Sequence, residues 1–245
     1  MTVSRYILVC AGCLAVAAAA AQRPAEAIDF SGVYRPAGLA VQPCGSNEWL
    51  RRSFETDKFC LGSDEGFPFS DAGLAAWQEY SPIEDPVLRC IESFPRSAMR
   101  GRPLRITLGE EITEIAYWFS NQWQTREVHM NGSPAPADLE HTDFGYSTGR
   151  WTGDTLIVET THTNGGPMFN DHKQSSPEAR YTERYWVAPD GRNLLMDIAI
   201  DDPIYYTTPF LVNRQEWLSA PDRPLSETEC TPSSIWAERD DDADE

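Results

Sequence analysis

Residues 180–201, which read RYTERYWVAPDGRNLLMDIAID, contain two strand candidates joined by a turn. In the second candidate every other residue is apolar, namely Leu194, Met196, Ile198 and Ile200. This period of two is typical of a strand with one face in a core and the other in polar surroundings. Between the candidates lies Pro189-Asp-Gly191, a set of turn residues, so the stretch predicts an antiparallel hairpin.

The same pattern, runs of β-branched and aromatic residues separated by turn signals, extends over most of the chain. It predicts an all-β fold in which an antiparallel β-meander closes into an up-and-down barrel, with an immunoglobulin-like sandwich as the alternative. Turns are expected at Asn131-Gly132 and at Thr152-Gly-Asp154, and one short helix near residues 72–80 with Ser70 as its N-cap. The expected strands are Gly32–Arg35, Leu104–Leu108, Ile112–Phe119, Thr125–Met130, Tyr146–Trp151, Thr155–Thr161, Arg180–Val187, Leu194–Ile200 and Tyr205–Trp217.

Residues 1–21 have the features of a secretory signal peptide, since Arg5 precedes an uncharged run that ends in small residues. We expect cleavage near Ala21, with lipidation at Cys13 as the alternative. Residues 22–235 are then expected to form a single barrel domain, and residues 236–245 an acidic disordered tail. These features predict a periplasmic or secreted protein with no membrane insertion after cleavage.

The chain is strongly acidic, with a formal net charge of −18, and it has no basic stripe, so nucleic acid is not an expected partner. Four cysteines remain after signal cleavage, and an even number in an exported chain predicts two disulfides. Three connectivities exist, of which we favour Cys44 with Cys60 and Cys90 with Cys230. The one C-x-x-C, Cys10 to Cys13, lies in the predicted signal peptide, so no zinc-type cysteine spacing survives cleavage. A nucleophile motif, a phosphate loop and a dinucleotide fingerprint are also absent, so neither a metal nor a cofactor is expected.

Three residues are candidate acid–base catalysts. His162 ends a predicted strand next to a Gly-rich loop, and an imidazole there can move a proton if a carboxylate orients it. Glu183 shares a strand face with Tyr181 and Tyr185, so it is either a buried acid or the partner of an arginine such as Arg126 or Arg150. The third candidate is Tyr146. The candidate ligand-binding residues are Arg126, His129, Glu159, Tyr181, Tyr185 and Trp118.

Several short segments occur together and in a fixed order: Leu74-Ala-Ala-Trp77, Asp85-Pro-Val-Leu-Arg-Cys90, Gly149-Arg-Trp-Thr-Gly-Asp-Thr-Leu156, Thr182-Glu-Arg-Tyr185 and Ile200-Asp-Asp-Pro203. In these the chain resembles a family of uncharacterised exported bacterial proteins. The resemblance implies a periplasmic or secreted protein with a barrel similar to lipocalins, and it implies no established activity. Two positions depart from the family, because relatives often carry histidine where this chain has Tyr146 and Arg180.

Three functions are compatible with these patterns. The chain has 11% aromatic residues, and a barrel that they do not fill completely would bind a hydrophobic or aromatic small molecule. The first alternative is a cofactor-independent lyase, isomerase or cyclase that uses Glu183, His162 or Tyr146 in the same cavity. The second is an interaction module of the cell envelope, which predicts an exposed apolar patch.

Overall fold

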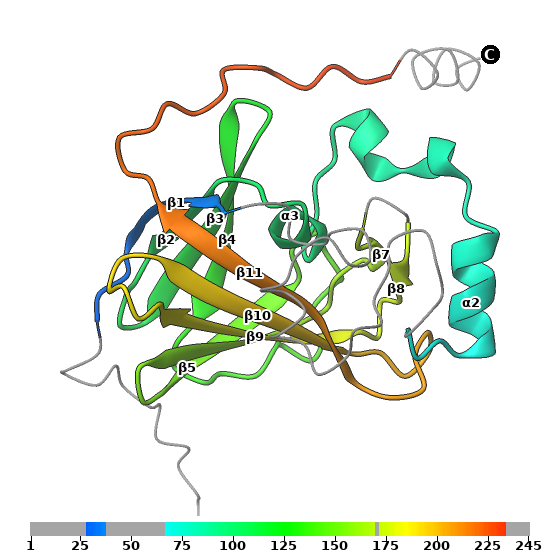
Figure 1. The fold of residues 1–245 in the computed structure, drawn as a ribbon. Coiled ribbons are helices and arrows are strands. Elements are labelled where there is room, and N and C mark those ends of the chain that lie inside the picture. Colours follow the sequence, from blue (N-terminus) through cyan, green and yellow to red (C-terminus); the bar gives the residue numbers. More distant parts are fainter. Residues whose placement is uncertain (1–27, 38–66, 170–171, 234–245) are drawn as a thin grey trace, which may run out of the picture.

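A closed nine-strand barrel forms the body of this computed structural model, which describes residues 28–37, 67–169 and 172–233 (Figure 1). The order of the strands around the barrel is β1-β11-β10-β9-β6-β5-β4-β3-β2. The predicted signal peptide, Cys44, Cys60 and the acidic tail lie outside the described residues. The barrel strands are β1 (Gly32–Pro36), β2 (Leu104–Thr107), β3 (Ile112–Phe119), β4 (Gln122–His129), β5 (Tyr146–Thr152), β6 (Thr155–Thr161), β9 (Arg180–Val187), β10 (Leu194–Asp201) and β11 (Phe210–Ser219).

The smaller elements lie beside the barrel. Helix α2 is next to the two-stranded β7–β8 sheet (Figure 1), and the Gln174 side-chain amide donates to the Ala76 carbonyl at 2.7 Å. Ser70 is the N-cap of α2, as predicted, because its hydroxyl accepts from the Gly73 amide. These elements are α2 (Asp71–Gln78), η1 (Pro82–Glu84), η2 (Pro86–Arg89), α3 (Arg96–Met99), β7 (Gly166–Pro167) and β8 (Gln174–Ser175).

The predicted antiparallel barrel is confirmed except at one seam. Strands β4 and β5 pair in parallel, and only over two residue pairs, Val128 with Ser147 and His129 with Thr148. The turn expected at Asn131-Gly132 is present, with a φ of 68° at Gly132, but it does not join two antiparallel neighbours. The chain from 130 to 145 instead returns beside the end of β4, so that β5 runs on in the same direction as β4. Parallel neighbours require such a long connection. The barrel is therefore mixed rather than strictly up-and-down.

One two-residue hairpin has a turn that the sequence prediction did not name. Ser120 and Asn121 have φ angles of 52° and 57°, and they connect Phe119 to its partner Gln122. Two successive residues with positive φ form the kind of turn that matches the twist of a β-hairpin. A second two-residue connection, Gly153-Asp154, lies where it was expected and joins Thr152 to Thr155.

The strand expected at Tyr205–Trp217 begins only at Phe210, because Asp202 organises a turn before it. The buried Asp202 carboxylate accepts hydrogen bonds from the amide and hydroxyl of Ser176 and from the amides of Ile204 and Tyr205. Asp202 thus forms a turn, and it also ties the β10–β11 connection to the segment that precedes β9.

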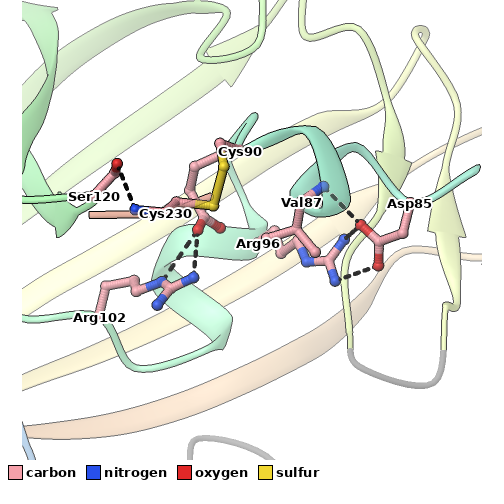
Figure 2. A network of polar contacts seen from close by, with 8 residues as sticks. Asp85, Val87, Cys90, Arg96, Arg102, Ser120 and Cys230 are labelled. Atoms are coloured by element: carbon pink, nitrogen blue, oxygen red, sulfur yellow. Dashed lines mark hydrogen bonds and ion pairs between the residues drawn. A yellow bond between two sulfur atoms is a disulfide. The ribbon is translucent and has the colours of Figure 1, made fainter. Parts of the chain in front are cut away.

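A segment from residue 82 to 102 covers part of the barrel and is fixed by polar contacts (Figure 2). Arg96 makes a two-fold ion pair with Asp85, with 2.6 Å between its Nη2 and Oδ2. Arg102 donates to Glu92 at 2.7 Å. The predicted Cys90–Cys230 disulfide is confirmed, and it fastens this segment to the chain that follows β11. The chain between these cysteines spans a sequence separation of 140 residues.

Asp85 makes the covering segment sensitive to acid. Burial alone would raise the pKa of Asp85, but hydrogen bonds from Arg96 and from the Val87 amide, with the nearby charges of Arg96 and His172, outweigh it and lower the pKa. A lowered carboxyl pKa stabilises the fold above the unfolded-state pKa, and this stability is lost as the pH falls through the folded-state pKa.

We therefore expect the amides of residues 82–100 to exchange faster as the pH falls below about 3.8, the ordinary value for aspartate. Exchange rates, corrected for the intrinsic effect of pH, measure this loss of protection. Asp85→Asn should already be poorly protected at neutral pH and respond little to acid, whereas the exposed Glu114→Gln should behave as the unmodified protein. Equal protection of the segment at pH 6 and pH 3 would contradict the assignment.

Candidate binding site in the barrel interior

A buried ion pair lies inside the barrel. The Arg126 Nη2 atom on β4 is 2.6 Å from both carboxylate oxygens of Glu183 on β9. The Tyr185 hydroxyl also donates to Glu183. Arg126 Nη1 donates to Ser147 at 3.1 Å and to Thr160 at 3.0 Å. We call these five residues the interior polar cluster; all of them are buried.

Strand alternation explains why these side chains meet. Tyr181, Glu183 and Tyr185 share one face of β9, as predicted, and this face points into the barrel. Of the two arginines considered as partners, Arg126 is confirmed, whereas Arg150 is on the outer surface and pairs with Glu159 at 2.7 Å. The reading of Glu183 as one half of a buried ion pair is therefore correct.

Burial and the ion pair shift the pKa values of Arg126 and of the phenols close to it. Burial lowers the pKa of Arg126, but the carboxylate of Glu183 outweighs this effect and raises the pKa above its usual value. Burial, together with the charge of Glu183, raises the pKa of Tyr185 well above 10. Burial likewise raises the pKa of Tyr117 to about 12. Both phenols are thus neutral at physiological pH, and the Tyr185 hydroxyl acts as a hydrogen-bond donor to Glu183 rather than as a base.

Phe94 covers the ion pair from the segment that contains α3. Its ring centroid is 4.2 Å from the Arg126 guanidinium carbon, and it meets the Tyr181 ring edge-on at 5.2 Å. The Phe94 amide donates to the Asp143 carbonyl, which holds the backbone in place. All four residues of α3 are buried. This segment shields the polar cluster from water and so strengthens its electrostatic interactions.

A second set of polar groups faces the interior from β11. Asn213, Gln215 and Trp217 alternate along this strand and are at most 4% exposed; we call them the β11 row. Neither amide atom of Asn213 has a hydrogen-bond partner, nor does the Gln215 Oε1 atom or the Trp217 Nε1 atom. Buried polar groups in folded proteins normally have partners, so each of these requires an explanation.

A β-bulge next to Asn213 sets its direction. Ile198 on β10 is opposite Asn213 while Ala199 is opposite Leu211, so Val212 is an extra residue on β11. Val212 and Asn213 are consecutive and both buried. Bulges of this kind redirect side chains and are common next to functional sites.

The three candidate catalysts do not converge. Glu183 is inside the barrel, whereas Tyr146 is on the outer face of β5, where its ring stacks on His129 at 4.6 Å and its hydroxyl donates to the Ser133 carbonyl. His162 follows the end of β6 with a φ of 57°, and its Nδ1 atom is 2.8 Å from the Thr161 hydroxyl. A mechanism that needs all three groups at one reacting centre is not compatible with this arrangement.

Half of the candidate ligand-binding residues point away from the interior. Arg126, Tyr181 and Tyr185 face inward, as expected. The other three do not, because strand alternation places them on the outer surface, and this corrects the prediction. There His129 stacks on Tyr146, Glu159 pairs with Arg150, and Trp118 donates to the Ser226 carbonyl at 2.8 Å.

The histidines form no metal site within the described residues. His141 and His162 approach each other with 5.3 Å between ring centroids, and His141 Nδ1 donates to the Thr163 carbonyl. His172 lies at the covering segment, 3.3 Å from Asp85 and stacked on Tyr80. Across this part of the chain no group of three or more histidine, cysteine or acidic side chains is arranged to hold a metal ion.

Sequence reasoning missed the β11 row, although a signal for it exists. Trp217 is a large aromatic residue that any barrel would bury, and counting back in steps of two from it gives Gln215 and Asn213 on the same face. Phe94 could not be found in this way, because it comes from an irregular segment whose position depends on the folded barrel.

Comparison with known proteins does not place this chain in a family. No protein-family model matches the sequence, and no curated protein matches it either. The resemblance to exported bacterial proteins therefore stays a prediction. A separate finding concerns membranes: within the described ranges, no helix is long and apolar enough to cross one.

Proposed function

We propose that this protein is an exported binding barrel that holds a small molecule in its interior. The observation that carries the proposal is the β11 row, in which both amide atoms of Asn213, the Gln215 Oε1 atom and the Trp217 Nε1 atom are buried and have no protein partner. Only the Gln215 Nε2 atom has one, the Glu216 carbonyl at 2.7 Å. A buried polar group without a partner destabilises a fold by about 1–3 kcal/mol. Three residues with such groups on one face of β11 are expected where the hydrogen bonds are made to a ligand instead of to the protein.

The interior polar cluster favours binding over acid–base catalysis. Both oxygens of Glu183 are engaged by Arg126, and Tyr185 donates to the same carboxylate. A general base needs a free lone pair directed at the substrate, and a general acid needs a proton that it can release. Glu183 instead serves as a fixed part of the wall, and it sets the position of Arg126 and Tyr185.

Export is the second part of the proposal. The Cys90–Cys230 disulfide supports it, because such bonds form and persist in oxidising compartments. The envelope-module alternative is less well supported. The large apolar side chains that are exposed lie on separate segments of the described chain, at Ile28, Ile83, Ile204 and Leu218.

Asn213→Leu tests the proposal, because it removes the buried amide and keeps the approximate shape of the side chain. We expect the ligand-free variant to be more stable than the unmodified protein by about 1–3 kcal/mol, which denaturant unfolding measures. We also expect native mass spectrometry of protein purified from its own source to show a small molecule on the unmodified chain and less of it, or none, on the variant.

The matched control is Gln78→Leu, which removes an exposed amide on α2 and should change neither measurement. An unmodified protein that carries no small molecule, together with an Asn213→Leu variant that is less stable, would show that Asn213 serves the fold and would overturn the proposal.

A further inference from the structure

The ligand's chemistry follows from the groups that the barrel offers to it, so this inference rests on the proposed function. Asn213 presents a carbonyl acceptor and an amide donor from one planar group, and neither has a partner. The complement of such a group is another planar group with a donor next to an acceptor. Lactams and cyclic imides have this edge, with N–H beside C=O.

The β11 row and the interior polar cluster are on opposite sides of a single strand. Ile198 on β10 pairs with Asn213 on one side and with Glu183 on the other. In the same way Met196 pairs with Gln215 and with Tyr185. Two strand spacings correspond to roughly 10 Å. A ligand that pairs with Asn213 would therefore lie over the apolar side chains of Met196 and Ile198, with the ion pair beyond them.

The interior favours a neutral ligand. Arg126 and Glu183 neutralise each other, so neither charge is left for a ligand of opposite sign. A charged ligand would lose its hydration at this depth without gaining a counter-ion, which is strongly unfavourable. The side chains of the β11 row are themselves uncharged, which suits a neutral ligand.

The shape of the ligand follows from its neighbours. Trp217 and Tyr185 contribute aromatic rings that are fully buried, while Met196 and Ile198 contribute flat apolar surface between the two polar groups. Aromatic walls favour planar rings. The indole N–H of Trp217 is a donor only, so it calls for an acceptor on the ligand.

We propose that the barrel binds an uncharged, planar ring compound with a lactam or imide edge. Asn213 binds this edge through two hydrogen bonds, and the Trp217 indole N–H donates to a second acceptor on the ligand. The N–H and C=O of the ligand would replace the two partners that the Asn213 amide lacks. Met196 and Ile198 would contact the face or edge of the ring.

Two closely related probes test the assignment. 2-Quinolone has the lactam edge, and N-methyl-2-quinolone has the same rings and carbonyl but no N–H donor. Titration calorimetry of the full exported chain, dialysed free of small molecules, should give an affinity for 2-quinolone at least about 10-fold higher than for the methylated probe. Asn213→Leu and Asn213→Ala should both abolish this preference, while Gln78→Leu keeps it. Asn213→Ala keeps the test valid if Asn213→Leu does not fold, and circular dichroism shows whether each variant is folded.

The outcomes separate this inference from the proposed function. Equal affinity for the two probes, or binding of neither, overturns the lactam assignment, and a small molecule retained in native mass spectrometry would then leave the binding function intact. If both Asn213 variants still prefer 2-quinolone to N-methyl-2-quinolone, the Asn213 amide is hydrogen-bonded to ordered water and does not contact the ligand. If no small molecule is retained and neither probe binds, both the inference and the proposed function fail.

Discussion

Replacing Arg126 with methionine is expected to lower the free energy of unfolding by about 3–5 kcal/mol, the usual cost of breaking a buried ion pair on one side. The variant leaves the Glu183 carboxylate buried with only the Tyr185 hydroxyl as a partner, and it removes donors to Ser147 and Thr160. Most of the loss should be recovered in the double variant Arg126→Met/Glu183→Leu, because no unpaired charge is then left in the barrel interior. Denaturant unfolding of the three proteins measures both effects.

The outer surface offers a matched control for this experiment. Arg150 and Glu159 form an ion pair at the similar distance of 2.7 Å, but their side chains are 51% and 50% exposed. Exposed pairs contribute little, so Arg150→Met should change the free energy of unfolding by less than about 1 kcal/mol. A loss of the same size for Arg126→Met and Arg150→Met would show that water reaches the interior polar cluster.

The disulfide Cys90–Cys230 should contribute about 3–5 kcal/mol to stability, because it closes a very long loop. A cross-link stabilises mainly by restricting the unfolded chain, and this effect grows with the length of the loop. The double variant Cys90→Ala/Cys230→Ala should therefore unfold at lower denaturant concentration. The covering segment from residue 82 to 102 should also become the first site of proteolysis, which limited digestion and mass spectrometry can map.

Substitution is a cleaner test than chemical reduction, because the sequence also contains Cys44 and Cys60. Adding a reductant to the double variant isolates the contribution of that second pair of cysteines. If the free energy of unfolding of the double variant falls by less than about 1 kcal/mol, the polar contacts of Asp85 and Glu92 are sufficient to hold the covering segment without the disulfide.

Regular strands were predictable from the sequence because their signal is local. In β10 the inward residues Leu194, Met196, Ile198 and Ile200 are all apolar, and the boundaries of β9 and β10 agree with the structure to within one residue. Alternation also placed Glu183 on the inward face of β9, but it left Arg126 and Arg150 open as its partner. The face of a strand depends on a few neighbouring residues, whereas the partner of Glu183 depends on the closed barrel.

Features that depend on distant parts of the chain were not predictable in the same way. Asn131-Gly132 has the residues of a hairpin turn, but whether the next strand returns beside β4 in the antiparallel direction depends on the length of the connection. His129 and Trp118 were assigned to the interior because of their chemistry, while their strands place them outside. Asn213 looked like an ordinary polar residue, and only the closed barrel shows that its amide is buried.

The short parallel seam between β4 and β5 has a consequence for the motion of the wall. Eight residue pairs join β3 to β4 and seven join β5 to β6, whereas only two join β4 to β5. Arg126 on β4 donates to Ser147 on β5, so a side chain inside the barrel crosses the seam where backbone hydrogen bonds are few. Local opening of the barrel wall between β4 and β5 is therefore expected to require that the Arg126 guanidinium release Ser147.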